Sequence, residues 1–308
     1  MSGDRGEEAA HPLVEPVVRL VETLGVEAAE PRVIRVGANL VVHLAPAPIV
    51  ARVATLTAEM RGRPLDYLRR ERVVCDALMA RGVNIVATTD LVDPGPHEVD
   101  GTACLLLNHH RLAPVDFDSS ADAVRVGRAF AQLSAALCDL PSHLGGGDGA
   151  EADDGQPWEE VAVLMRTVAP TTEASTVDRI AGVVETLRAG EPDDRWQLVH
   201  GDAHRSNVAL DDRGEIIWFD FEDTNRRPPA WDLASLHRSW PAAGRVAADA
   251  LGVELGSYSV RWHHELREVY ALLWNLLYAQ RFPESRAATA DRAATWLTRP
   301  VEQLLRRY

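Results

Sequence analysis

The chain has 308 residues, and its formal net charge of −14 reflects 46 acidic residues against 32 arginines, because lysine does not occur in it. Nucleic acids and anionic membranes require a basic face on their partner, so this balance excludes both as expected ligands and permits a cationic one. An apolar share of 46% and a charged share of 25% are ordinary for a globular protein, and the length allows about two domains.

The first third of the chain predicts one helix followed by strands of an antiparallel meander. Apolar residues recur at helical spacing in residues 11–28, and the next three apolar runs, 32–36, 40–44 and 49–54, have the pattern of strands. The turn at residues 37–39 either closes a hairpin or also covers a bound phosphate. The sequence leaves both open, since the turn lacks a full glycine-rich motif.

Residues 65–80 predict a helix with a carboxylate, Glu71, in its apolar stripe. Alternation along the strand at residues 49–54 places Arg52 among small apolar neighbours. An unpaired buried charge is costly, so each of these side chains needs a partner. Either Arg52 and Glu71 pair with each other, or Glu71 is half exposed and pairs with the arginines beside it in its own helix.

Two further strands are predicted at residues 85–91 and 102–107, which completes a five-stranded sheet. The polar linker 108–111 then leads into a helical part of the chain. Helices are expected there at residues 121–140, 158–167, 176–189, 231–240, 258–280 and 284–307. The interval 141–157 is rich in Gly and Asp and buries too little surface to order itself, so we expect a flexible acidic loop.

The clearest chemical pattern lies between the last two groups of helices. A short apolar strand at residues 196–199 ends before Asp202, which therefore lies on a loop, and Asn207 follows five residues later. A polar turn then separates two β-rich runs, which form a hairpin that ends at Asp220. Closing this hairpin is expected to place Asn207 beside Asp220, so that an amide oxygen and a carboxylate face one point.

These side chains suit phosphoryl transfer. Mg²⁺ takes oxygen ligands, retains several waters and relies on one or two protein groups plus phosphate oxygens, which fits Asn207 and Asp220. Asp202 can accept a proton from an alcohol. Since phosphoryl transfer depends mainly on positioning and on neutralising charge, only a cation for the phosphates is missing from this set.

The same stretch resembles the catalytic core of the aminoglycoside phosphotransferase and choline kinase-like family, relatives of the protein kinases. His200-Gly201-Asp202 stands where kinases have His-Arg-Asp, Asn207 matches their Asn, and Asp220-Phe221-Glu222 matches their Asp-Phe-Gly. Glu222 departs from that Gly, as the Asp-x-Asp or Asp-x-Glu pattern of the small-molecule kinases tolerates. Downstream, Asp232 matches the residue that braces the catalytic loop in the family.

The resemblance implies a bilobal, protein kinase-like α+β fold. Residues 1–107 would form a nucleotide-binding lobe with a five-stranded antiparallel sheet, and residues 108–308 a mainly helical catalytic and substrate-binding lobe. The implied reaction transfers the γ-phosphate of Mg·ATP, with GTP as an alternative donor, to a hydroxyl of a small molecule. An aminoglycoside or another amino-alcohol is the candidate acceptor, because the acidic chain favours a cationic one.

The resemblance also assigns roles to individual residues. The catalytic base is Asp202, and the Mg²⁺ ligands are Asn207, Asp220 and Glu222. The nucleotide is bound by Arg52, Glu71, Asn108 and His109. Because lysine is absent, Arg52 takes the place of the usual phosphate-binding lysine. The hinge residues Asn108 and His109 fit a plain polar linker equally well, and His204 is expected to be exposed and has no assigned role.

A second hypothesis from another class is a catalytically silent nucleotide-binding protein or scaffold, which the missing lysine and the incomplete glycine motif suggest. The expected location is the cytoplasm. Residues 1–8 lack the pattern of a signal peptide, the longest apolar run is too short to span a bilayer, and the three cysteines lack metal spacing. The sequence does not indicate an oligomeric state.

Overall fold

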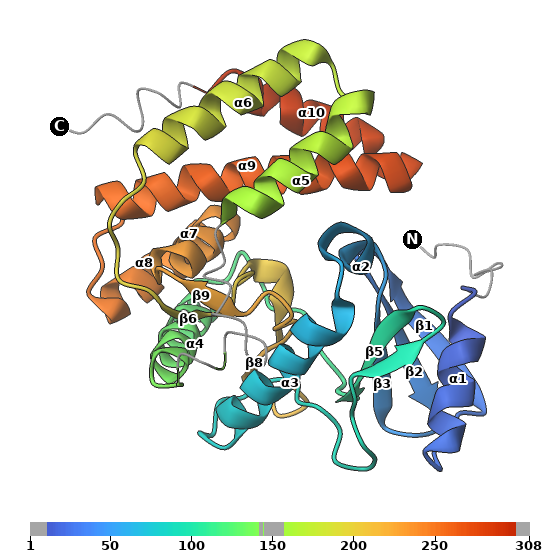
Figure 1. Cartoon of the computed structure of the whole chain (residues 1–308). Helices are drawn as coiled ribbons and strands as arrows, with labels where there is room; N and C mark the ends of the chain where they lie inside the picture. Colours follow the sequence, from blue (N-terminus) through green and yellow to red (C-terminus); the bar gives the residue numbers. More distant parts are fainter. Residues whose placement is uncertain (1–10, 142–143, 145–156, 300–308) are drawn as a thin grey trace. The chain divides into compact units, whose positions relative to one another are not determined.

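The computed structural model describes residues 11–141, 144 and 157–299, and it divides into two compact units (Figure 1). The first unit contains the chain up to Pro114 together with Ala209–Asp223. The second contains Val115–Val208 and the chain from Thr224 onward. The expected acidic loop at 141–157 lies almost wholly outside the described residues, as does the segment 1–8.

The first unit is built on a five-stranded antiparallel sheet, as predicted. Its strands are β1 (Glu30–Val36), β2 (Asn39–Ala45), β3 (Ile49–Ala54), β4 (His97–Val99) and β5 (Thr102–Asn108), in the order β1-β2-β3-β5-β4. Alternation along β3 sends Ala51 and Val53 into one apolar cluster and Ala54 into another on the opposite face. Arg52 therefore points to the same face as Ala54, as the sequence pattern indicates.

Helices cover both faces of this sheet (Figure 1). The helix α1 (Val14–Thr23) packs on the face of Ala51 through Val17 and Val21, and α3 (Pro64–Met79) packs on the opposite face through Tyr67 and Leu68. A short helix that the sequence did not predict, α2 (Leu56–Arg61), follows β3 directly. The helix α3 is the predicted helix of residues 65–80, and its buried face includes Glu71.

The strand predicted at residues 85–91 does not form, and β4 is the fifth strand instead. The N–H of Val86 donates to the carbonyl of Trp218, whereas the N–H of Thr89 donates to that of Leu106. The segment changes its partner within a few residues, so it makes isolated bridges rather than a continuous ladder.

The predicted hairpin is present as the two-stranded sheet of β7 (Val208–Leu210) and β8 (Ile216–Trp218). The side-chain amide of Asn84 donates to the Asp211 carboxylate and to the Ile216 carbonyl, both at 3.0 Å. These bonds join the hairpin to the first unit, together with the bond between Val86 and Trp218. The residues after the hairpin, which include Asp220, therefore belong to that unit although they lie far from it in sequence.

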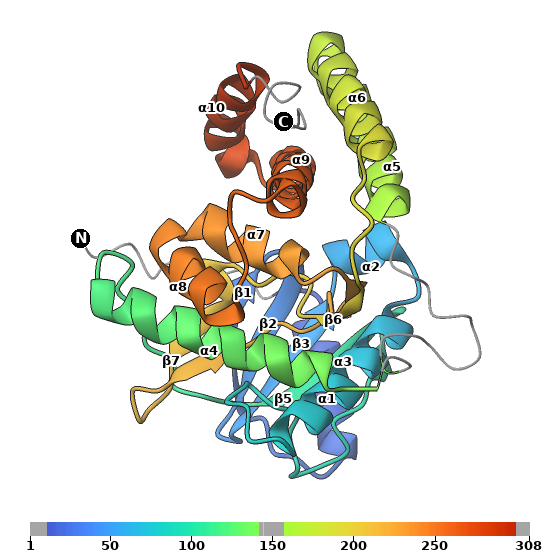
Figure 2. The same cartoon turned by 90° about the vertical axis from the view of Figure 1, so that its left-hand side faces the viewer.

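The second unit is mainly helical and has one small sheet, of β6 (Gln197–Val199) and β9 (Asn225–Arg227). Its helices are α4 (Ser120–Cys138), α5 (Pro157–Val168), α6 (Ala174–Ala189), α7 (Ala230–Ser239), α8 (Pro241–Leu251), α9 (Tyr258–Arg281) and α10 (Arg286–Leu297). Figure 2 shows α9 nearly end-on, with α7 beneath it and with α10 and α5–α6 on its two sides. Every predicted helix is present with shifted ends, and α8 is additional.

The last predicted helix ends earlier than expected, at Leu297, and the residues from 300 onward lie outside the described chain. None of the helices among the described residues combines the length and the apolar character needed to cross a bilayer.

Candidate active site

The loop between β6 and β7 is held from behind by α7. The Asp232 carboxylate accepts hydrogen bonds from the backbone N–H groups of His200, at 2.6 Å, and of Gly201, at 3.0 Å. The indole Nε1 of Trp231 donates to the Gly201 carbonyl at 2.7 Å. Gly201 has a φ of 88°, a left-handed conformation that favours glycine, so the turn that presents Asp202 requires this residue type. The bracing role expected for Asp232 is thereby confirmed.

Both carboxylate oxygens of Asp202 are hydrogen bonded, and the side chain is 28% exposed. Oδ1 accepts from Nη2 of Arg267 at 2.5 Å, and Oδ2 lies 3.0 Å from Nε2 of His204. His204 accepts the N–H of Ser206 at its Nδ1, so its Nε2 carries a hydrogen and donates it to Asp202. The Nδ2 of Asn207 adds bonds to the Asp202 carbonyl, at 2.9 Å, and to Oδ2, at 3.3 Å.

These partners fix the charge of Asp202. Burial alone would raise the pKa of its carboxyl group, but the contacts with His204 and then with Arg267 outweigh burial and lower the pKa below its ordinary value. Asp202 is therefore an ionised and oriented carboxylate at neutral pH. Its remaining exposed surface gives a hydroxyl group access to it.

Arg267 and His204 were missed by the sequence reasoning. Arg267 lies on α9, is buried, and also donates to the Ser235 hydroxyl, at 3.0 Å, and to the Gly201 carbonyl, at 3.3 Å. The sequence did contain a signal for Arg267. A charged residue within the apolar run of α9 needs a partner once it is buried, as Glu71 does in α3. His204 was expected to be exposed without a role, but it is half-buried and contacts Asp202.

Asn207 is buried at the end of the loop. Its amide nitrogen is used for the bonds to Asp202, so the amide oxygen is the atom suited to a cation. Asn207 belongs to the second unit and Asp220 to the first.

The first unit carries a cluster of charged side chains around Arg52, which is only 4% exposed. Its guanidinium contacts the carboxylates of Glu71 and Asp220 directly and lies 3.5 Å from that of Glu222. The other oxygen of Glu71 accepts the N–H of Phe221 at 3.2 Å, which ties α3 to the segment after the hairpin. Of the two alternatives for Glu71, the pair with Arg52 is the one that forms.

Two further arginines approach the same carboxylates. Arg61 of α2 lies 2.5 Å from Asp223 and 3.9 Å from Glu222, and the half-exposed Arg35 lies 3.7 Å from Asp220. Burial raises the pKa of Glu222 to about 7, with Asp220 and Asp223 adding to the shift and Arg52 and Arg61 opposing it. Three guanidinium groups thus face four carboxyl groups, and the cluster is negatively charged when Glu222 is ionised.

This charge balance fits a bound divalent cation at Asp220 and Glu222. Among the described residues, no three His, Cys, Asp or Glu side chains form a metal-binding group by themselves. Mg²⁺ does not require one, because it commonly takes one or two carboxylates and completes its shell with phosphate oxygens and water. Asp220 has a φ of 70°, a left-handed conformation uncommon for a non-glycine residue and often found at functional positions.

Of the two predicted hinge residues, Asn108 is the last residue of β5 and His109 follows it directly. The N–H of Asn108 donates to the Ala87 carbonyl and that of His109 to the Pro48 carbonyl, both at 2.9 Å. The His109 ring stacks on His43, with centroids 3.8 Å apart. Because both N–H groups are used inside the unit, a nucleotide base would have to meet other backbone groups of the linker.

A kinase-like α+β fold with this loop and this charged cluster defines a phosphotransferase of the small-molecule kinase class. Residues 28–273 match the family described as the phosphotransferase enzyme family, and the chain belongs to that family. No curated protein sequence matches the chain at a significant level.

Solved structures with the same fold have low sequence identity to this chain. The GDP complex of wild-type aminoglycoside 2'-phosphotransferase-IIIa aligns with a TM-score of 0.68 and 14% identity over 92% of this chain and 98% of the other. Choline kinase LicA from Streptococcus pneumoniae aligns at 0.63 and 12% identity over 92% and 98%. Amicoumacin kinase hAmiN, in complex with AMP-PNP, Ca²⁺ and Ami, aligns at 0.65 and 14% identity over 93% and 97%.

Proposed function

We propose that the enzyme transfers the γ-phosphoryl group of Mg·ATP to a hydroxyl group of a small molecule, with Asp202 at the acceptor hydroxyl. The observation that carries the proposal is the state of Asp202. Its carboxylate is ionised, held by three side chains on a loop braced by Asp232, and still open to solvent.

In the proposed reaction the acceptor oxygen bonds to the γ-phosphorus while the bond from that phosphorus to the β–γ bridging oxygen breaks. ADP leaves with the bonding electrons, and the proton of the hydroxyl group passes to Asp202. A carboxylate with a lowered pKa is a weak base, so its main contribution is orientation. That suits a loose transition state, in which the hydroxyl group becomes acidic only as its bond to phosphorus forms.

The nucleotide belongs with the first unit. We assign Arg52, positioned by Glu71, to the phosphates, and Asp220 and Glu222 to Mg²⁺, with the Asn207 amide oxygen as a further ligand. When bound, the metal ion would neutralise charge on the phosphates. ATP and GTP both remain candidate donors, since GDP occupies the 2'-phosphotransferase and AMP-PNP the amicoumacin kinase. Their bound nucleotides and Ca²⁺ support a nucleotide and a divalent cation here.

The acceptor is a small molecule rather than a macromolecule, in keeping with the aminoglycoside and choline kinases that share the fold. A net charge of −14 raises the local concentration of cations, so an amine on the acceptor would favour its approach. This electrostatic attraction acts at long range, so it does not indicate which side chains contact the acceptor.

The test compares Asp202→Ala with the unaltered enzyme in phosphate transfer from ATP to a panel of amino-alcohols, sugars and hydroxy acids. Turnover should fall by about 10²-fold or more with ATP affinity almost unchanged, because orientation and proton transfer act in the transition state. Asn207→Ala and Asp220→Ala should weaken Mg·ATP binding instead. Near-normal turnover of Asp202→Ala would refute the assignment.

A catalytically silent nucleotide-binding protein is the second candidate. The contacts of Arg52 favour it, because three carboxylates already engage its guanidinium and phosphates would have to compete with them. Binding of Mg·ATP without transfer to any alcohol in the panel would select this alternative over the first.

A further inference from the structure

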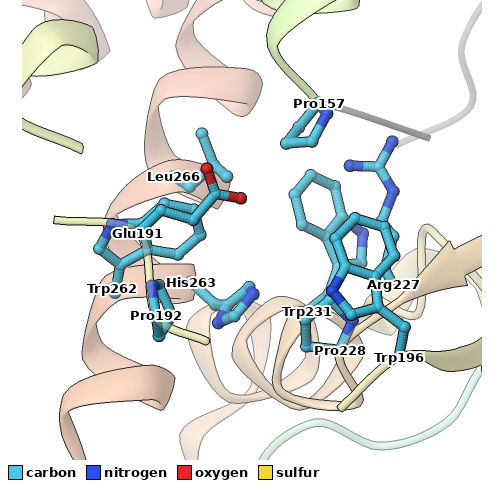
Figure 3. A pocket seen from close by; sticks show the side chains of 10 residues that line it. All are labelled: Pro157, Glu191, Pro192, Trp196, Arg227, Pro228, Trp231, Trp262, His263 and Leu266. Atoms are coloured by element: carbon cyan, nitrogen blue, oxygen red, sulfur yellow. The ribbon is translucent and has the colours of Figure 1, made fainter. Parts of the chain in front are cut away.

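A cavity in the second unit is too small to take a nucleotide or an acceptor. It lies between Trp231 and Trp262, with Pro157 at the top of the view (Figure 3). Its volume of about 20 Å³ suffices for about one water molecule. The sheet of the first unit, in contrast, presents charged side chains beside Asp220, and one of them has no role in the proposed reaction so far.

That side chain is Arg35, which an irregularity in β1 turns to the other face of the sheet. Val33 pairs with Val42, whose side chain belongs to the apolar cluster under α1. Strict alternation would put Arg35 on this apolar face as well. The register shifts at Ile34, however, and Arg35 pairs with Val41. Such a bulge redirects the side chains that follow it, so Arg35 points away from α1.

Arg35, Val41 and Arg52 form a row across three neighbouring strands. Val41 of β2 pairs with Arg35 on one side and with Arg52 of β3 on the other, and directly paired residues of antiparallel strands share a face. Neighbouring strands lie about 4.8 Å apart, so the two arginines leave the sheet about 10 Å from each other. Both guanidinium groups meet at Asp220, where Arg52 contacts Oδ1 and Arg35 lies 3.7 Å from Oδ2.

The two arginines differ in how firmly they are held. Arg52 is buried and also pairs with Glu71, so its guanidinium is fixed in place. The side chain of Arg35 is 49% exposed, and its distance of 3.7 Å from Asp220 is that of a weak surface ion pair. Solvent screens such a pair, so Arg35 can exchange Asp220 for another anion with little loss of stability.

The backbone that carries Arg35 is anchored, although its side chain is exposed. The turn at residues 37–39 follows directly, and the Ala38 carbonyl accepts bonds from the Thr55 hydroxyl, at 2.9 Å, and the Thr57 N–H, at 3.2 Å. The Thr57 hydroxyl also donates to Oδ1 of Asn39 at 2.9 Å. Binding of a ligand by Arg35 therefore orders one side chain and no loop, which keeps the entropic cost of binding small.

The phosphates of a nucleotide need more donors than Arg52 can offer. Its guanidinium is already shared among Glu71, Asp220 and Glu222. A nucleoside triphosphate brings several charged oxygens, and the planar fork of a second guanidinium matches two of them. Arg35 is the guanidinium that shares the face of Arg52 and contacts the same carboxylate.

We propose that Arg35 is a second phosphate-binding arginine, which pairs with Asp220 in the free enzyme and with the phosphates of the bound nucleotide. This role rests on the proposed function, because it presumes that the nucleotide and its divalent cation bind at Arg52 and Asp220. A cation on the Asp220 carboxylate displaces Arg35, whose donors then serve the phosphates. Two arginines thereby do the work for which the lysine-free chain lacks a lysine.

The test measures binding and needs no turnover. Isothermal titration of the full chain with Mg²⁺ uses AMP-PNP and GMP-PNP, and the affinities of adenosine and guanosine are obtained by competition. Arg35→Met should weaken binding of the tighter triphosphate analogue by about tenfold, because it removes a charged donor, and should leave the affinity of the matching nucleoside unchanged. Arg35→Lys should lie between Arg35→Met and the unaltered chain, since lysine keeps the charge without the fork.

The matched control is Arg19→Met, which removes one positive charge from an exposed position on α1, over the opposite face of the sheet. It should leave the triphosphate affinity unchanged, which excludes a long-range effect of charge. Should Arg35→Met fail to fold, Arg35→Lys decides by the same comparison of triphosphate with nucleoside.

The outcomes separate this role from the proposed function. Equal triphosphate affinity in Arg35→Met and the unaltered chain, or equal losses for the triphosphate and the nucleoside, overturns the role of Arg35 and leaves the proposed function intact. Failure of the unaltered chain to bind either triphosphate analogue overturns the proposed function itself, and the role of Arg35 with it.

Discussion

Replacement of Arg267 by methionine tests how Asp202 is controlled. The change keeps most of the side-chain volume but removes the 2.5 Å ion pair to Asp202 and the bonds to Ser235 and Gly201. Breaking a buried ion pair costs about 3–5 kcal/mol, and the 28% exposure of Asp202 together with its remaining partners reduces this to about 2 kcal/mol of unfolding free energy. The variant should therefore fold with lower stability.

The kinetic effect should appear in kcat and leave the KM for ATP nearly unchanged. Misplacement of an orienting group by about 1 Å can cost about 10²-fold, so we expect a loss of about 10- to 100-fold in phosphate transfer. The pH profile separates this role from a merely structural one. In the unaltered enzyme the acidic limb due to Asp202 should lie below the ordinary carboxyl pKa of 3.8, and in Arg267→Met it should move to higher pH.

The free energy of unfolding should depend on pH through the same lowered pKa of Asp202. A pKa lowered in the folded state adds stability above the unfolded pKa, and that contribution is lost as the pH falls through the folded pKa. The stability difference between the unaltered enzyme and Arg267→Met should therefore be largest near pH 7 and narrow on acidification. Arg267→Lys is the control that keeps the charge. An unchanged kcat and an unchanged acidic limb in Arg267→Met would refute the reasoning.

Three further outcomes are expected. Arg52→Lys should raise the KM for ATP, because a point charge cannot replace the planar fork, and Glu71→Gln should reproduce part of that loss; unchanged kinetics in both would remove Arg52 from the nucleotide site. Burial raises the pKa of Cys75 and Cys104 to about 12, whereas Cys138 is exposed, so a thiol reagent should modify Cys138 alone in the native chain and all three cysteines in denaturant. Native reaction of every thiol would contradict this burial. If the acceptor carries a net positive charge, its kcat/KM should fall as salt shortens the Debye length toward about 3 Å at 1 M, and a flat response would reject long-range attraction.

The sequence by itself determined features that depend on local periodicity. Alternation along one strand placed Arg52 on the face opposite Ala51, and helical spacing placed Glu71 on the buried stripe of α3. Once both positions were known to be buried, the cost of an unpaired charge required the ion pair that the structure contains. The hairpin after Asn207 and the loop that carries Asp202 were predictable for the same reason, since turn residues and β-rich runs alternate at short range.

Tertiary structure decided everything that depends on which distant segments meet. Residues 85–91 have the composition of a strand, but the available partners, Trp218 and Leu106, lie on different segments, and no periodicity in the sequence indicates that change of partner. Arg267 is 65 residues from Asp202, and only the fold brings the two side chains together. A sequence shows that a buried charge needs a partner, whereas packing alone determines which partner it receives.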